Sequence, residues 1–191
     1  MYNCFMNKWK KLDSKLVLEA INFKVREDIV EYPDGRRTKW TYWDSPESVM
    51  ILGMTDDKKL IFERQYRYLV GEELLEVPAG SVKEEETIEG AARREFREEV
   101  GYTAENFIPL GAFYETYGQL NRRVHMFFAP NAQRIEQDPD RGNRGYEEIE
   151  VELKTVDEAV SLALTNLLPG TPSTLIVLLL SENINKGKIK I

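Results

Sequence analysis

The sequence predicts an α/β protein. Short apolar or alternating segments, typical of strands, run along most of the chain, and among them lies one amphipathic segment at residues 88–100 that is typical of a helix. Two further helical segments follow near the C-terminus. Strands interleaved with a central helix and with terminal helices favour an α/β fold. With 191 residues, the chain has the length of one domain with a small N-terminal appendage.

The N-terminal part of the chain, residues 1–45, is predicted to form a β-meander. Residues 16–31 alternate enough to indicate strands, residues 33–35 (Pro-Asp-Gly) are a turn sequence, and residues 38–43 form a returning strand. We therefore divide the chain into this segment and a larger domain at residues 46–191.

The larger domain is predicted to combine strands with three helices. A polar turn at residues 55–58 joins two apolar runs and indicates a hairpin. Strands are expected at residues 48–54, 60–67, 106–114, 123–129 and 149–153, and helices at residues 88–100, 156–166 and 173–183.

The segment at residues 88–100 has clear signals for a helix at both of its ends. Thr87 is a candidate N-cap, and Gly101 suits the position after the helix, where the backbone turns left-handed. An apolar stripe along the segment, which includes Phe96 and Val100, is suited to burial against a sheet. We expect this helix to be a fixed element of the core.

Three carboxylates, Glu95, Glu98 and Glu99, fall on one face of this helix because their spacing is i, i+3 and i+4. Like charges this close repel one another and would weaken a helix that had only a structural role. Carboxylate oxygens are the ligands that Mg²⁺ and Mn²⁺ prefer, and a bound cation would remove the repulsion. The alternative is a solvated helix rich in Glu and Arg.

The charge and composition narrow the classes of partner. The net charge of −7 argues against broad binding to nucleic acid or to an anionic membrane surface. The longest wholly apolar run, residues 175–180, is too short to cross a bilayer, and the N-terminus lacks the apolar core of a signal peptide. Because Cys4 is the only cysteine, we expect no internal disulfide and a cytoplasmic location. His125, the only histidine, is expected in a strand and not in a catalytic triad.

Residues 80–102 fit the gapped pattern G-x5-E-x7-R-E-U-x-E-E-x-G-U, where U is apolar or aromatic. The fixed positions are Gly80, Glu86, Arg94, Glu95, Phe96, Glu98, Glu99, Gly101 and Tyr102. This segment resembles the signature of the Nudix hydrolases. The resemblance implies an α/β/α sandwich with a mixed sheet, preceded here by an N-terminal antiparallel β subdomain.

We call residues 80–102 the box. Motifs outside the box extend the resemblance over most of the chain. Segments such as R-Q-Y-R-Y at residues 64–68 and E-V-P-A-G at residues 76–80 are similar to the branch that hydrolyses ADP-ribose and other nucleoside diphosphate sugars. Members of that branch are typically homodimers, so the resemblance implies that residues 1–45 serve dimerisation and base binding. It also implies a pocket that draws on both chains.

The resemblance implies the following metal site and catalytic residues. Glu95 and Glu99 would be the principal ligands of Mg²⁺, or of Mn²⁺, together with the backbone carbonyl of Ala79. Glu98 would be a ligand or the base, and Glu147 on a late loop is a further candidate for the catalytic base. The alternative for Glu147 is an exposed loop carboxylate. Within the box, Glu86 would pair with Arg94 and brace the loop against the helix.

Five residues are candidates for contacting the substrate. Trp9 and Trp40 lie where related enzymes have indoles that hold adenine, although buried tryptophans are also ordinary core residues. Arg64 and Arg67 are expected to share a face of one strand and to reach a phosphate, unless they form only surface ion pairs. Tyr117 stands where many relatives have a proline on a loop that contacts the terminal sugar or phosphate, and it is otherwise a packing aromatic.

The sequence thus predicts metal-dependent hydrolysis of the diphosphate bond of a nucleoside diphosphate sugar. ADP-ribose, which would give AMP and ribose 5-phosphate, is the expected substrate. Two alternatives stay open. One is hydrolysis of another nucleotide, such as GDP-mannose or a dinucleoside polyphosphate. The other is a non-catalytic Nudix module that binds ADP-ribose.

Overall fold

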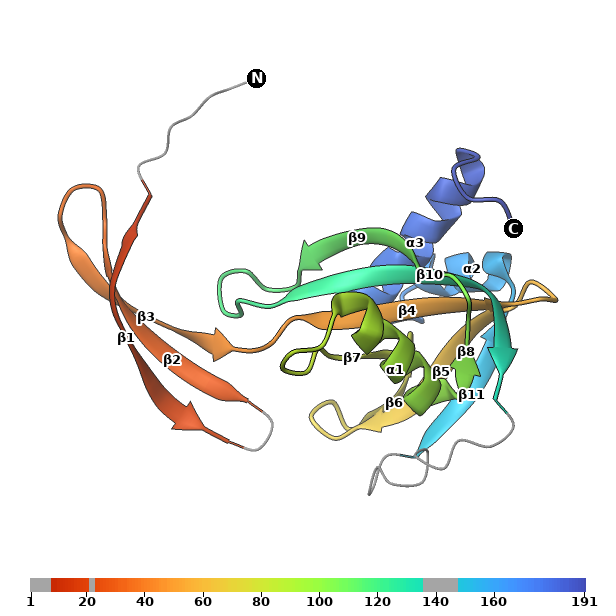
Figure 1. Cartoon of the computed structure of the whole chain (residues 1–191), viewed down its shortest axis with the longest axis horizontal. Helices are drawn as coiled ribbons and strands as arrows, with labels where there is room; N and C mark the ends of the chain where they lie inside the picture. Colours follow the sequence, from red (N-terminus) through yellow and green to blue (C-terminus); the bar gives the residue numbers. More distant parts are fainter. Residues whose placement is uncertain (1–7, 21–22, 136–147) are drawn as a thin grey trace. The chain divides into compact units, whose positions relative to one another are not determined.

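A computed structural model describes residues 8–20, 23–135 and 148–191 of the chain. The chain forms two compact units (Figure 1). The smaller unit comprises residues 1–45 together with residues 116–122, and the larger unit comprises residues 46–115 and 123–191. Each unit is described by itself below.

The smaller unit is built on a three-stranded antiparallel sheet. Its strands are β1 (Lys10–Glu19), β2 (Lys24–Glu31) and β3 (Arg37–Asp44), in the order β1-β2-β3. The expected meander is therefore present, but β1 begins earlier than the expected residue 16. The charged sequence at the start of β1 carries no apolar alternation, and it is held in the strand by pairing with β2.

The larger unit contains a mixed sheet, as expected from the fold class. The sheet has the order β11-β5-β4-β10-β8, with β6 paired to β5, β7 to β4 and β9 to β10. Strand β10 is parallel to β4, whereas its pairs with β8 and β9 are antiparallel. The strands are β4 (Ser48–Thr55), β5 (Leu60–Arg67), β6 (Glu72–Glu76), β7 (Ala79–Ser81), β8 (Tyr102–Thr103), β9 (Ile108–Tyr114), β10 (Arg123–Arg134) and β11 (Ile149–Lys154).

Helices cover both faces of this sheet. Helix α1 (Ile88–Val100) packs on one face, and helices α2 (Val156–Leu164) and α3 (Thr171–Asn185) pack on the other (Figure 1). The α/β/α sandwich implied by the resemblance is confirmed. In the part of the chain that the structure describes, none of the helices combines the length and the apolar character needed to span a membrane.

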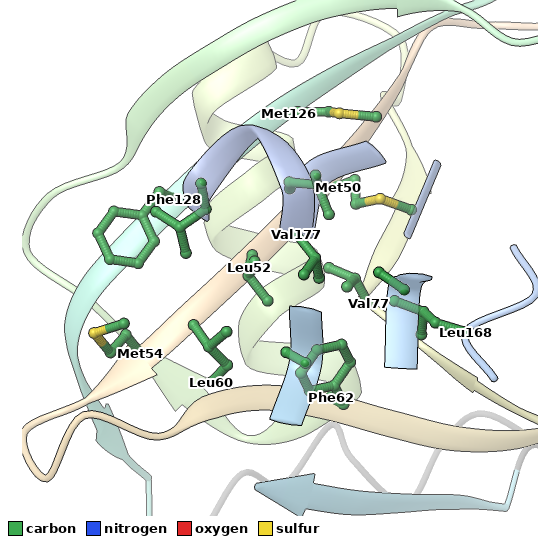
Figure 2. Close-up of a cluster of buried hydrophobic side chains, with 14 of the residues drawn as sticks. Met50, Leu52, Met54, Leu60, Phe62, Val77, Met126, Phe128, Leu168 and Val177 are labelled. Carbon is green, nitrogen blue, oxygen red and sulfur yellow. The ribbon is translucent and has the colours of Figure 1, made fainter. Parts of the chain in front are cut away.

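The side chains of strand β4 alternate between the two halves of the core. Met50, Leu52 and Met54 point toward α2 and α3, where Phe62 and Val177 pack against them (Figure 2). The intervening residues face α1 and contribute to the second half of the core, whose members include Val49, Ile51, Ala92, Phe96 and Val100. Burial on both faces explains why residues 49–54 carry no polar side chain.

Candidate active site

Helix α1 has the bounds and caps that the sequence predicts. The Thr87 side chain accepts a hydrogen bond from the Gly90 backbone N–H at 3.0 Å. Gly101 is left-handed, with φ of 71°, and its N–H donates to the carbonyl of Arg97 at 3.0 Å. The predicted apolar stripe is buried against the sheet. Because both ends and one face are fixed, the carboxylates on the helix have defined positions.

Strand β7 brings the backbone of Ala79 and Gly80 against these carboxylates. The Ala79 N–H donates to Glu99 Oε2 at 2.8 Å. The Glu95 side chain is almost wholly buried, and a Cβ added at Gly80 would lie 2.1 Å from Glu95 Cδ. Only glycine permits such a close approach, so the first glycine of the box is explained by the position of Glu95.

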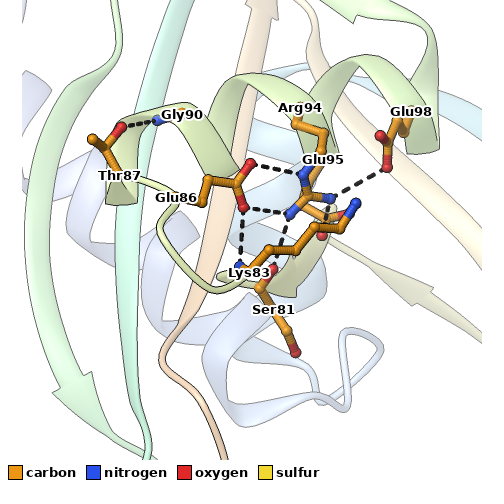
Figure 3. Close-up of polar contacts among 8 residues, drawn as sticks. All are labelled: Ser81, Lys83, Glu86, Thr87, Gly90, Arg94, Glu95 and Glu98. Carbon is orange, nitrogen blue, oxygen red and sulfur yellow. Dashed lines mark hydrogen bonds and ion pairs between the residues drawn. The ribbon is translucent and has the colours of Figure 1, made fainter.

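Arg94 connects the loop of the box to its helix (Figure 3). Its Nε and Nη2 donate to the two carboxylate oxygens of Glu86 at 2.8 and 2.9 Å, which confirms the expected pair. Its Nη1 donates to Glu95 Oε1 at 2.6 Å and to Glu98 Oε2 at 3.3 Å, and its Nη2 also reaches the carbonyl of Ser81 at 2.9 Å. One guanidinium thus offsets the repulsion among several box carboxylates.

The charge of Arg94 alters the acidity of Glu86. Its hydrogen-bonded guanidinium lowers the pKa of the Glu86 carboxyl from 4.5 to about 2, with a smaller contribution from the backbone N–H of Lys83. In turn, the hydrogen bond to Glu86 is the largest cause of the raised pKa of Arg94. The ion pair that braces the loop therefore persists at neutral pH.

This pKa predicts how the brace depends on pH. Because the folded pKa of Glu86 is depressed, its stabilisation is fully present above pH 4.5 and is lost as the pH falls toward about 2. We expect Glu86→Gln to lower the free energy of unfolding by roughly 1–3 kcal/mol near neutral pH, and by much less at low pH. Thermal unfolding of variant and wild type over this pH range tests the expectation.

The matched control for Glu86→Gln is Glu89→Gln. Glu89 lies on the same helix and pairs with Arg93, but both side chains are about half exposed, so the control should change stability little at any pH. An effect of Glu86→Gln that does not vary between pH 4.5 and about 2 would contradict the assignment.

The donor groups around Ala79 suit a hard divalent cation. Glu95, Glu98 and Glu99 of α1 supply carboxylate oxygens, and two of them lie against the backbone of β7, where Ala79 donates to Glu99 and Gly80 leaves room for Glu95. Among residues 8–20, 23–135 and 148–191, no three His, Cys, Asp or Glu side chains lie close enough together to hold one metal ion in their present positions. Arg94 instead contacts two of the carboxylates. The residues fit a divalent cation by donor type and by their place beside β7.

Arg64 and Arg67 do not share a face, and that expectation is wrong. The two residues are three positions apart in β5, so their side chains point to opposite sides of the sheet. Arg64 Nε donates to Glu152 at 2.5 Å on the α2 and α3 side. Arg67 forms a bidentate pair with Glu76 on the other side, at 2.9 and 2.7 Å.

Of the two arginines, Arg67 is the one near the box. The hydrogen bond to Glu76 raises the pKa of Arg67 most strongly, and the charges of Glu63 and Glu99 add to the rise. Arg67 is therefore within electrostatic reach of a candidate metal ligand. Sequence reasoning missed Glu76, although it lies in the E-V-P-A-G segment. In the β5–β6 register Glu76 is opposite Glu63 and Arg67 is opposite Glu72, so the long side chain of Arg67 reaches along the strand to Glu76.

Trp9 and Trp40 lie together in the smaller unit. Their ring centroids are 5.6 Å apart, and the rings meet edge to face, with an interplanar angle of 71°. Both are exposed, at 49% and 40%, so neither is a core tryptophan. In this arrangement the two rings do not form a parallel slot for a base, but each presents an accessible indole surface.

Tyr117 belongs to the same unit as Trp40. Residues 116–122 run alongside β3, where the Trp43 N–H donates to the carbonyl of Gln119 at 2.8 Å. A cavity of about 200 Å³ lies between this segment and β3, and Trp40, Tyr42 and Tyr117 line it. Two of the candidate substrate residues are thus brought together from distant parts of the sequence.

Two of the expectations concern residues on or near late strands. Glu147 lies outside the described residues. His125 is in β10, as expected, and its imidazole contacts Glu47, which also accepts a hydrogen bond from Arg123 at 2.6 Å. Arg123, the largest cause, and His125 lower the pKa of Glu47.

The fold and this site define a hydrolase whose acidic helix lies against a short glycine-containing strand. A family model described as the NUDIX domain matches residues 44–172, and the chain belongs to the Nudix family. It is a Nudix pyrophosphohydrolase, and Nudix hydrolases generally use divalent metal ions.

Known proteins similar to this chain agree with this assignment. The ADP-ribose pyrophosphatase of Bacillus subtilis (strain 168) is 33% identical over 133 residues, which cover 70% of this chain and 71% of that protein. The methanol dehydrogenase activator of Bacillus methanolicus is 27% identical over 127 residues, covering 66% and 69% of the two chains. A solved structure described as an ADP compounds hydrolase has the same fold, with a TM-score of 0.80 at 20% identity over 96% of this chain and 98% of the other.

Proposed function

We propose that this protein hydrolyses the diphosphate bond of a nucleoside diphosphate sugar, and that ADP-ribose is the substrate, giving AMP and ribose 5-phosphate. The observation that carries the proposal is the position of Glu95 and Glu99 against the backbone of Ala79 and Gly80, with Glu98 on the same helix and bonded to the same Arg94 as Glu95. The similarity to an ADP-ribose pyrophosphatase supports the choice of substrate.

In this proposal the box carboxylates hold a divalent cation, Mg²⁺ or Mn²⁺. When bound, such an ion neutralises charge on a diphosphate and lowers the pKa of a coordinated water. Glu95 and Glu99 hold it together with the carbonyl of Ala79. Glu98 is a further ligand or takes the proton from the attacking water, and Glu147 is the alternative base.

Other side chains would bind the two ends of the substrate. Trp9 and Trp40 take the nucleobase on their exposed indole surfaces, and Tyr117 contacts the substrate from the segment beside β3. Arg67 contacts a phosphate on the box side of the sheet, where the Glu76 carboxylate holds its guanidinium in a fixed orientation. Arg64 points to the opposite side of the sheet, away from the box, which argues against a contact between Arg64 and a substrate phosphate.

A panel of nucleotides tests the function directly. The protein is incubated with Mg²⁺ or Mn²⁺ and ADP-ribose, GDP-mannose, NADH or a dinucleoside polyphosphate, and a phosphatase then releases inorganic phosphate from the monophosphate products. We expect the highest kcat/KM with ADP-ribose. A higher kcat/KM with GDP-mannose or a dinucleoside polyphosphate would mean that this nucleotide, and not ADP-ribose, is the substrate. Binding of ADP-ribose without turnover would indicate a non-catalytic module.

We also propose that the protein is a cytoplasmic homodimer that assembles through residues 1–45. Among the described residues of the smaller unit, only Asp28 and Leu120 are buried, and the apolar side chains of β1 are all exposed by 43% or more. A three-stranded sheet with so little core needs a further surface to pack against. Light scattering should then give about twice the chain mass of 22.2 kDa, and a monomer at micromolar concentration would contradict the proposal.

A further inference from the structure

The sheet of the smaller unit has two chemically different faces. On one face, Glu27 of β2 pairs with Lys15 at 3.0 Å and with Lys39 at 3.1 Å, so its carboxylate is fully matched by cations. The next residue, Asp28, points to the other face, where it lies opposite Trp40 in the register of β2 and β3. That second face carries aromatic rings.

Asp28 is an unusual residue in this position. It is only 8% exposed, in a unit where nearly every other described residue is exposed or half-buried. Its Oδ1 is fully buried, and among the described residues it has no hydrogen-bond partner. A buried carboxylate oxygen without a donor destabilises the folded protein, because it has lost its hydration without a replacement.

The nearest cation does not compensate Asp28 by a hydrogen bond. Arg26, two residues earlier on the same face, directs its Nε to the carboxylate of Asp44 and its Nη1 to the hydroxyl of Ser14 at 3.5 Å. Burial raises the pKa of the Tyr42 hydroxyl, and the charges of Asp28 and Asp44 and a side-chain hydrogen bond to Asp28 add to this rise. The Asp28 carboxylate therefore lies beside Tyr42 and hydrogen-bonds to it, while its buried Oδ1 has no donor among the described residues.

Asp28 lies opposite a residue that lines the cavity described above. Trp40, opposite Asp28, and Tyr42, opposite Arg26, are on the same face of β3, and both line that cavity of about 200 Å³. Tyr117 closes it from the segment beside β3 and is 87% exposed. The cavity thus offers flat aromatic surfaces, and one strand away, behind Trp40, lies a buried hydrogen-bond acceptor; aromatic surfaces and an acceptor are the two features that recognise a nucleobase bearing an amino group.

We propose that Asp28 is a specificity-determining residue that accepts a hydrogen bond from the 6-amino group of adenine, with Trp40 or Tyr42 stacked on the ring. This inference rests on the proposed function, because it concerns the base of the same substrate. Because Oδ1 is fully buried, the base reaches it only if a neighbouring side chain moves, and the indole of Trp40, which is 40% exposed, has room to do so. Binding then supplies the missing donor.

The test compares two substrates that differ only in the amino group. ADP-ribose and its analogue with unsubstituted purine, which has no N–H on the six-membered ring, are assayed with the wild type, Asp28→Ala and Asp28→Asn. The wild type should favour adenine by about 10-fold or more in kcat/KM, since a hydrogen bond to a charged acceptor is lost with the analogue. Asp28→Ala should reduce that ratio to about one, and Asp28→Asn, whose amide oxygen still accepts, should restore part of it.

Glu27→Ala is the matched control, because it removes a carboxylate from the other face of the same strand and should leave the ratio unchanged. The ratio is insensitive to a general loss of folded protein, so partial unfolding of Asp28→Ala does not imitate the effect. A ratio near ten or above in Asp28→Ala, or a ratio near one in the wild type, overturns the role of Asp28 while leaving the hydrolytic function intact.

A binding measurement separates this inference from the proposed function. Calorimetric titration with AMP and with the monophosphate of unsubstituted purine riboside needs no turnover. If the wild type hydrolyses no nucleotide but prefers AMP, and Asp28→Ala loses that preference, the hydrolytic function is wrong and the role of Asp28 stands. If the wild type binds the two monophosphates equally, the role of Asp28 is wrong.

Discussion

Glu99→Gln is expected to keep the native fold and to lose at least about 100-fold in kcat. The Gln oxygen can still accept the hydrogen bond from the Ala79 N–H, which is 2.8 Å from the Glu99 carboxylate, so the contact between α1 and β7 is retained. The negative charge that would hold a divalent cation is removed, and several kcal/mol of transition-state stabilisation corresponds to a factor of 100 or more, at about 1.4 kcal/mol per decade.

Steady-state kinetics with ADP-ribose and circular dichroism of the same samples check this expectation. Glu89→Gln is the control, since it removes a carboxylate from the exposed first turn of the same helix. Activity of Glu99→Gln within a few fold of wild type, or full activity of the wild type in EDTA, would rule out the metal-dependent mechanism.

Trp40→Ala is expected to raise KM for ADP-ribose by about 10-fold or more, and Trp9→Ala should act in the same direction. Stacking of a base on an aromatic ring contributes roughly 1–3 kcal/mol, and the exposed indoles of both residues are free to provide it. The value of kcat should change less, because the base is remote from the phosphorus atom that reacts.

The control for both tryptophan variants is Trp43→Ala. Trp43 is also on β3 and is 57% exposed, but it is an odd number of residues from Trp40, so it points to the other face of the sheet, where it contacts Phe23. An unchanged KM in a natively folded Trp40→Ala variant would refute the stacking role, as would an equal rise in Trp43→Ala.

The features that were predicted correctly depend on residues close together in sequence. Helix α1 begins and ends where expected because its caps, Thr87 and Gly101, act on backbone groups within a single turn. The pair of Glu86 and Arg94 was also predicted, although only from the resemblance to the family. Local rules and a gapped motif therefore define most of the box.

The features that were missed depend on how strands pair. Strands β6, β7 and β8 are too short for a periodic pattern, and hydrogen bonds to β5, β4 and β10 hold them in place. The position of Asp28 opposite Trp40 follows from strand register, and the pair of Arg67 with Glu76 requires β6 to lie beside β5; a linear sequence displays neither. The error over Arg64 and Arg67 had a simpler cause, since an odd separation in a strand always reverses the face.

The segment that runs along β3 also constrains the order of events during synthesis. Residues 116–122 complete the smaller unit, yet they follow β3 by a long stretch of chain, and the side chain of Asn121 bonds to Asp44 at 2.7 Å and to the backbone of Ser45 at 3.0 Å. As the chain grows on the ribosome, β1, β2 and β3 emerge early, but the smaller unit is complete only when residues 116–122 have also emerged. The aromatic cavity is therefore a late product of translation, finished only after the whole box, residues 80–102, has left the exit tunnel.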